Sequence, residues 1–165
     1  MKTEAIHETR RLWEAEPEKA RVRPMVSARA DGSQAVMQAG SFTWRADLPA
    51  ALGGTNQAPS PTLLLLSALA GCAVVFIRDT LAPQFAVRVT DVQATVRCET
   101  DFRGLLGISA ITPDLENLQL DIEIVSPDDE AEVQQICRAW EDRCPIYLAL
   151  LKPMAVATNF RVTKG

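Results

Sequence analysis

The feature that most constrains this chain is an apolar run from Leu63 to Ile77, "LLLLSALAGCAVVFI". A helix needs about 20 apolar residues to cross a bilayer. This run is shorter, and Pro61-Thr62 and Arg78-Asp79 close it on its two sides. We therefore expect a buried core helix. Ser60 and Pro61 are favoured at the N-cap and the first helical position, and we expect the helix to end before Pro83.

The run is apolar around the whole circumference of the predicted helix, so it has no face suited to water. A chain of 165 residues offers few other elements to enclose such a helix. We therefore expect a second subunit to provide part of its cover.

Composition limits the possible partners and the compartment. One domain is expected for this length, and an apolar fraction of 47% excludes disorder. The net charge is -4 and the basic residues form no stripe, which argues against nucleic-acid binding. The first twenty residues are charged and contain no apolar signal region, so we expect a cytoplasmic protein with reduced cysteines.

The remaining pattern predicts an α+β fold. Residues 1–20 are expected to form a charged helix or arm, helical over 3–15, and residues 21–165 one domain. An antiparallel meander is expected over residues 22–47 with a turn at Asp31-Gly32, followed by a long loop before the apolar helix. Further predicted elements are a strand over Phe85–Glu99 with a bulge near Thr90-Asp91, a strand over 117–125, a helix capped by Ser126 and Pro127 that ends at Cys144, a short helix over 145–151, and a strand over 154–162.

Thiol chemistry is the candidate function that remains after metal binding and histidine-activated catalysis are excluded. His7 is the single histidine and no Cys-x-x-Cys spacing occurs, so metal ligation and histidine-activated nucleophiles have no support. Cys72 lies inside the apolar helix, and Cys144 lies where Pro145 forces one helix to stop. Cys98 is in phase with the apolar side chains of a strand. Cys137 lies roughly 10 Å from Cys144 along the same helix, too far for a disulfide.

Three segments resemble the OsmC/Ohr family, the osmotically inducible and organic hydroperoxide resistance proteins. They are "LGGTNQAPSPTLLLLSALAGC", "DFRGLLGI" and "CRAWEDRCPIYLALLKP", and the similarity runs from Phe42 to Pro153. The most specific part is a Gly-Cys in the apolar helix paired with a later Cys-Pro. The resemblance implies an OsmC-like fold, in which antiparallel sheets wrap around a long central helix in an intertwined homodimer.

The resemblance also implies an activity, the thiol-dependent reduction of small organic hydroperoxides. By it, Cys72 matches the peroxidatic cysteine and Cys144 the resolving cysteine, joined in an intramolecular disulfide that an external dithiol reduces. It implies no metal and no organic cofactor. From the charge pattern and the length of the apolar run we expect no nucleic-acid or membrane partner.

The peroxidatic thiolate needs a cation, which the family takes from its first strands. Arg29 in "ARADG" is the nearest match and Arg45 is a second candidate. The family glutamate that holds this arginine is replaced by Thr62, which cannot bind a guanidinium bidentately. Asp47 and Asp101 are the candidate substitutes.

Two other functions fit the same pattern. One is a non-catalytic dimer of this fold that binds a small apolar ligand between its subunits, which Thr62 favours. The other is a redox sensor whose Cys72–Cys144 disulfide forms slowly and alters a partner interaction. A low pKa of Cys72 and rapid turnover distinguish the enzyme from both.

Overall fold

The first sheet of this α+β fold is the predicted meander. The computed structural model describes residues 2–152 and 154–164. In it β1 (Ser27–Asp31), β2 (Gln34–Ala39) and β3 (Phe42–Ala46) form one antiparallel sheet in that order, with the first turn at Asp31-Gly32 as predicted. Gly32 has a φ of 62°, a left-handed conformation that glycine adopts without strain. The register aligns Arg29 and Arg45 on either side of Val36, so all three share one face of the sheet.

The apolar run forms the long helix α2, Pro61–Phe76, which starts where the sequence predicts. The Oγ of Ser60 accepts a hydrogen bond from the Leu63 N–H at 3.3 Å. The expected end before Pro83 is wrong, because the helix continues through a π turn, η3 (Ile77–Leu81), into α3 (Ala82–Gln84). In this wider turn the Ala82 N–H donates to the Ile77 carbonyl, so the helix is loosened just before Pro83, which has no N–H to donate.

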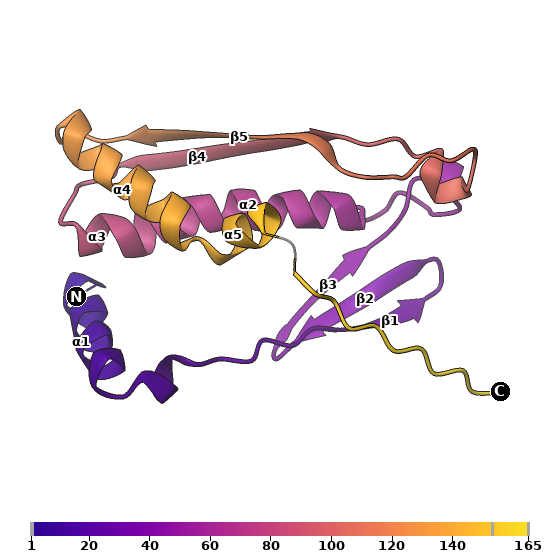
Figure 1. Cartoon of the computed structure of the whole chain (residues 1–165), viewed down its shortest axis with the longest axis horizontal. Coiled ribbons are helices and arrows are strands. Elements are labelled where there is room, and N and C mark those ends of the chain that lie inside the picture. The colour runs from indigo at the N-terminus through magenta and orange to yellow at the C-terminus, as the bar shows by residue number, and fades with distance from the viewer. Residues whose placement is uncertain (1, 153, 165) are drawn as a thin grey trace.

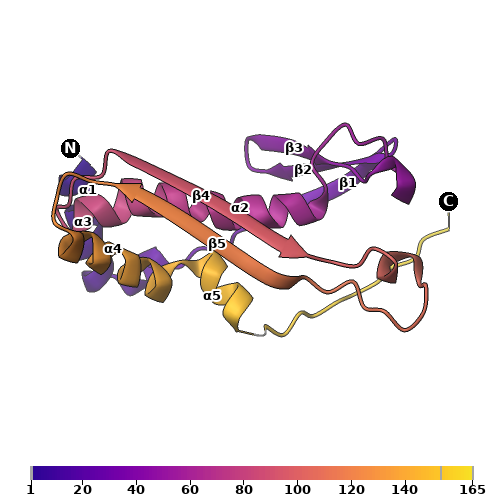
Figure 2. The same cartoon turned by 90° about the horizontal axis from the view of Figure 1, so that it is seen from above.

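The second sheet pairs β4 (Asp91–Glu99) with β5 (Glu116–Val125) and lies along α2 (Figures 1 and 2). The predicted strand over Phe85–Glu99 is wrong in its first part. The Phe85 N–H still donates to Leu81 at the helix end, so the change of phase reflects a helix end and not a bulge at Thr90-Asp91. The register shift of this sheet lies instead between Arg97 and Glu99.

Two helices follow, α4 (Glu130–Arg143) and α5 (Pro145–Leu151), and Cys144 joins them in an extended conformation as predicted. The predicted cap at Ser126 is wrong, because α4 begins after Asp129. The Ser126 Oγ instead donates to the Arg88 carbonyl at 2.6 Å and accepts from the Asp128 N–H at 3.1 Å. This turn ties the start of α4 to the segment before β4.

The predicted last strand does not form within this chain. Residues 154–162 are extended but pair with no strand of the described residues, and Figure 1 shows them running away from the helices. The side chains of Val156 and Phe160 are 81% and 92% exposed. A strand needs a neighbouring edge for its hydrogen bonds, and residues 154–162 pair with the edge of neither described sheet.

The core forms where α2 meets α4 and the inner face of β4. Its most buried members are Leu69, Ala73, Ile77, Leu81, Ile136 and Cys144. The predicted N-terminal helix is α1 (Lys2–Ala15), which packs against α3. By length and composition the helical stretch Pro61–Gln84 would also be able to cross a membrane, a property that the core helices of globular proteins share.

Candidate functional site: two thiols between α2 and the α4–α5 junction

The fold brings together two cysteines that are far apart in the sequence. The Sγ atoms of Cys72 on α2 and Cys144 at the α4–α5 junction lie 2.9 Å apart. Cys144 is fully buried, whereas Cys72 is half-buried. Both predicted thiols therefore lie in one site, and only a small approach separates them from a covalent bond.

Backbone hydrogen bonds fix the position of Cys144 at the junction. Its N–H donates to the Trp140 carbonyl at 2.8 Å and ends α4. Its Sγ accepts from the Tyr147 N–H at 3.5 Å and so caps α5. Pro145 keeps the helix from continuing through this residue, which turns the thiol toward α2.

The electrostatics of the site within one chain disfavour the Cys72 thiolate. Burial, together with the hydrogen bond to Cys144 and the charge interaction with it, raises the pKa of Cys72 from 9.0 to about 12. The backbone N–H of Ile146 opposes this shift. With such a pKa, Cys72 is a neutral thiol at pH 7 and a poor nucleophile.

The two candidate arginines lie on the β1–β2–β3 sheet and not at the thiols. Arg45 donates hydrogen bonds to Asp31 and Gln34, each at 2.8 Å. Arg29 makes no side-chain hydrogen bond or ion pair within residues 2–152 and 154–164, and no arginine contributes to the pKa of Cys72. The single chain therefore leaves Arg29 available and Arg45 engaged.

Neither substitute carboxylate stands at the thiols. Asp47 is buried and accepts hydrogen bonds from the backbone of Leu48, Thr55 and Gln57 and from the Thr55 hydroxyl. These bonds hold the pKa of Asp47 well below its usual range and fasten the loop before α2. Asp101 pairs with Arg103 at the far end of the β4–β5 hairpin. Thr62, in the first turn of α2, carries no charge.

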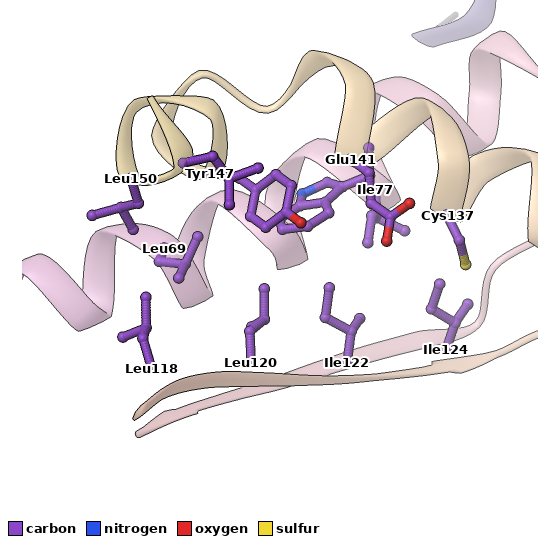
Figure 3. A pocket seen from close by; sticks show the side chains of 12 residues that line it. Leu69, Ile77, Leu118, Leu120, Ile122, Ile124, Cys137, Glu141, Tyr147 and Leu150 are labelled. Atoms are coloured by element: carbon purple, nitrogen blue, oxygen red, sulfur yellow. The ribbon is translucent and has the colours of Figure 1, made fainter. Parts of the chain in front are cut away.

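The structure also shows a cavity that sequence reasoning missed. It has a volume of about 590 Å³ and lies between β5, α2, α4 and α5, as Figure 3 shows. Cys137, for which the sequence predicted only its distance from Cys144, lines this cavity together with Glu141 one turn later on α4. Burial, and then the Glu141 carboxylate, raise the pKa of Cys137. The alternation of β5 was visible in the sequence, but the sequence did not show which helices pack against that strand.

The described residues, 2–152 and 154–164, contain no group of three or more His, Cys, Asp or Glu side chains that could hold a metal ion.

Comparisons with known proteins agree with this arrangement. A family model described as "OsmC-like protein" matches residues 54–159. The comparison with curated proteins found no match.

Solved structures share the fold at low sequence identity. An OsmC-like protein from Mycoplasma pneumoniae is 22% identical with a TM-score of 0.65, covering 79% of this chain and 88% of that one. An organic hydroperoxide resistance protein from Legionella pneumophila is 19% identical with a TM-score of 0.53, covering 78% and 89%. One from Elizabethkingia anophelis is 17% identical with a TM-score of 0.58, covering 78% and 88%.

Proposed function

Because this chain belongs to the OsmC-like family, we propose that it reduces small organic hydroperoxides with the thiols of Cys72 and Cys144. The observation that carries the proposal is the 2.9 Å separation of the two Sγ atoms. The two residues are 72 positions apart in the sequence, yet their thiols are close enough to form a disulfide with little backbone movement.

The reaction proceeds in two steps that balance. The Cys72 thiolate attacks the terminal peroxide oxygen and breaks the O–O bond, which leaves a sulfenic acid on Cys72 and, after protonation of the alkoxide, an alcohol. The Cys144 thiol then attacks the Cys72 sulfur, forms the S–S bond and releases water. The peroxide has gained two electrons and the pair of thiols has lost them.

The exposure of the two thiols supports this division of roles. Cys72 is half-buried and open to a small peroxide, whereas Cys144 has no exposed surface. The same difference in exposure determines how the disulfide is reduced. An external dithiol attacks the more exposed Cys72 sulfur and releases Cys144 as the leaving thiol. A reducing compartment such as the cytoplasm supplies such a dithiol.

Activation of Cys72 requires a cation, because burial and the contact with Cys144 raise its pKa to about 12 in the single chain. We assign this role to Arg29 of the partner subunit in a homodimer. Arg29 is exposed and has no side-chain partner within the described residues, whereas Arg45 is bound by Asp31. A guanidinium beside the sulfur favours the charged form and lowers the pKa.

The surface of α2 supports a second subunit. Leu63, Leu65 and Val75 on this helix are 54%, 39% and 51% exposed. Apolar side chains in this number on a core helix favour burial against another chain. The unpaired segment 154–162, with its alternating apolar side chains, adds a second surface that a partner would cover.

The test is stopped-flow oxidation of the reduced protein by cumene hydroperoxide, followed by mass mapping of the disulfide. We expect rapid, stoichiometric formation of a Cys72–Cys144 disulfide that fails in Cys72→Ser and in Cys144→Ser. Cys98→Ser is the matched control, because Cys98 lies on β4 away from the pair, and it should react like the wild type.

A slow or absent reaction would refute the peroxidase. It would favour a ligand-binding module of the same fold. The raised pKa of Cys72 and the uncharged Thr62 both support that alternative. A slow disulfide that changes the surface of the protein would point to a redox sensor instead.

A further inference from the structure

The cavity beside α4 and α5 has the shape of a binding site for an elongated molecule. Four apolar side chains of β5 stand in a row along it, from Leu118 to Ile124, a span of about 20 Å at the usual rise of a strand. Leu69 of α2 and Leu150 of α5 close one end. A volume of about 590 Å³ falls within the range of small-molecule sites.

The opposite end of the cavity is polar. Figure 3 shows the Glu141 carboxylate and the Cys137 thiol toward that end, away from Leu118, and the Tyr147 hydroxyl near the middle of the row, above Leu120 and Ile122. Within residues 2–152 and 154–164, neither the Tyr147 hydroxyl nor the Glu141 carboxylate makes a hydrogen bond or an ion pair. Tyr147 is partly buried and Glu141 is exposed, so among these residues one donor and one anionic acceptor without a protein partner stand beside the apolar channel.

We propose that this cavity binds a neutral single-chain amphiphile, an alkyl chain of medium length with a hydroxyl head group. The hydroxyl oxygen accepts a hydrogen bond from Tyr147, and its proton is donated to the Glu141 carboxylate. The alkyl chain lies along the row of β5 side chains. A carboxylate head group would meet the charge of Glu141 and is disfavoured.

This site goes beyond the proposed peroxidase and is separate from its thiols. Neither Cys72 nor Cys144 lines the cavity. The exposed apolar residues of α2 that we expect a second subunit to cover, Leu63, Leu65 and Val75, do not line it either. A subunit packed on that face alone would leave the cavity open, whereas Leu118, Leu150 and Leu151, which do line the cavity, are themselves exposed.

The test is isothermal titration calorimetry of the reduced full-length protein with 1-decanol, 1-octanol and sodium decanoate. We expect one 1-decanol per chain. 1-Octanol should bind about 15-fold more weakly, since each buried methylene contributes about fourfold. Decanoate should bind more weakly than 1-decanol at pH 7.5. The same titration of Cys72→Ser should be unchanged, which separates this site from the thiol chemistry.

Variants of the lining identify the site. Leu120→Trp fills the channel and should abolish binding, whereas Leu106→Trp, on the exposed η4 turn (Gly104–Leu106), is the size-matched control. Tyr147→Phe removes one hydrogen bond and should weaken 1-decanol by about fivefold. Glu141→Gln should improve decanoate binding, a change of selectivity that a general loss of folding would not produce.

Two results would overturn the proposal. One is the absence of 1-decanol binding to the wild type, as expected if another chain fills the cavity. The other is binding that Leu120→Trp, Tyr147→Phe and Glu141→Gln all leave unchanged, which would place the ligand elsewhere.

Discussion

The α4–α5 junction and the β1–β2–β3 sheet contribute to the proposed site in opposite ways. At the junction, Cys144 and Trp140 are buried, and one chain alone holds the two sulfurs 2.9 Å apart. On the sheet, every residue of β1 is exposed and Arg29 makes no contact with the thiols. One chain thus brings the two sulfurs together, while it places neither candidate arginine beside them, and we propose that assembly supplies that charge.

The largest effect that tests this contrast comes from the junction. Cys144→Ser removes the resolving thiol, so oxidation by excess peroxide should give no intramolecular disulfide and should carry Cys72 on to sulfinic acid. Intact-mass analysis measures both products. Cys137→Ser is the matched control from the same helix and should still form the disulfide. A disulfide to Cys98 or Cys137 in the Cys144→Ser variant would show that the junction is not the required partner.

The sheet should reveal its role through the reactivity of Cys72. In the assembled protein we expect a Cys72 pKa far below the value of about 12 that one chain imposes, because the partner's arginine stabilises the thiolate. Arg29→Gln should slow alkylation by iodoacetamide at pH 7 at least tenfold, which corresponds to one unit of pKa.

Arg45→Gln is the control for that experiment. Its guanidinium is already bound by Asp31 and Gln34, so the alkylation rate should change little. A larger effect of Arg45→Gln than of Arg29→Gln would reverse the assignment.

The same contrast explains what the sequence could predict. Local rules placed the Ser60 cap, the Asp31-Gly32 turn and the break before Pro145, because neighbouring residues determine each of them. The pairing of Cys72 with Cys144 came from family resemblance, since nothing in the spacing of the two residues reveals it. The arginine could not be chosen, because neither Arg29 nor Arg45 lies at the thiols within one chain.

The errors have a common cause, which is that tertiary contacts override local signals. Ser126 has the sequence of a cap, yet its hydroxyl binds the Arg88 carbonyl and the helix begins later. Pro83 has the sequence of a helix end, yet the π turn before it lets the helix continue. Residues 154–162 alternate like a strand but pair with neither of the two described sheets.

The loop between β3 and α2 joins the β1–β2–β3 sheet to the helix that carries Cys72. Gly54 is the tightest point of this loop. A Cβ at Gly54 would lie 1.9 Å from the Leu48 carbonyl oxygen, so Gly54→Ala should destabilise the protein by about 1–3 kcal/mol. Gly53→Ala is the comparison, because a Cβ at Gly53 meets no other atom and only the φ of 86° is unfavourable for alanine. We expect this variant to lose about 1 kcal/mol of stability. Urea denaturation measures both. Equal losses would mean that the loop yields to the clash.

Asp47 should make this connection sensitive to acid. Its hydrogen bonds lower its pKa below the ordinary 3.8, so the stability they provide is present above pH 4 and is lost as the pH falls through the lowered value. Asp47→Asn should be less stable than the wild type at pH 7, and the difference should shrink as the pH falls below 4. Thermal melts across pH 2.5–7 test this, and a constant difference would exclude the carboxylate charge as the cause.

The smallest effect is expected for the ion pair between Asp31 and Arg45. Both side chains are about half exposed, and water screens their attraction at 2.8 Å. A double-mutant cycle with Asp31→Asn and Arg45→Gln should give a coupling free energy of about 0.2–1 kcal/mol, which added salt reduces. A coupling of several kcal/mol would instead mean that the assembly buries this face of the sheet. Arg45 would then be a second candidate for the position beside the thiols. The proposed assignment of Arg29 to that position would have to be revised.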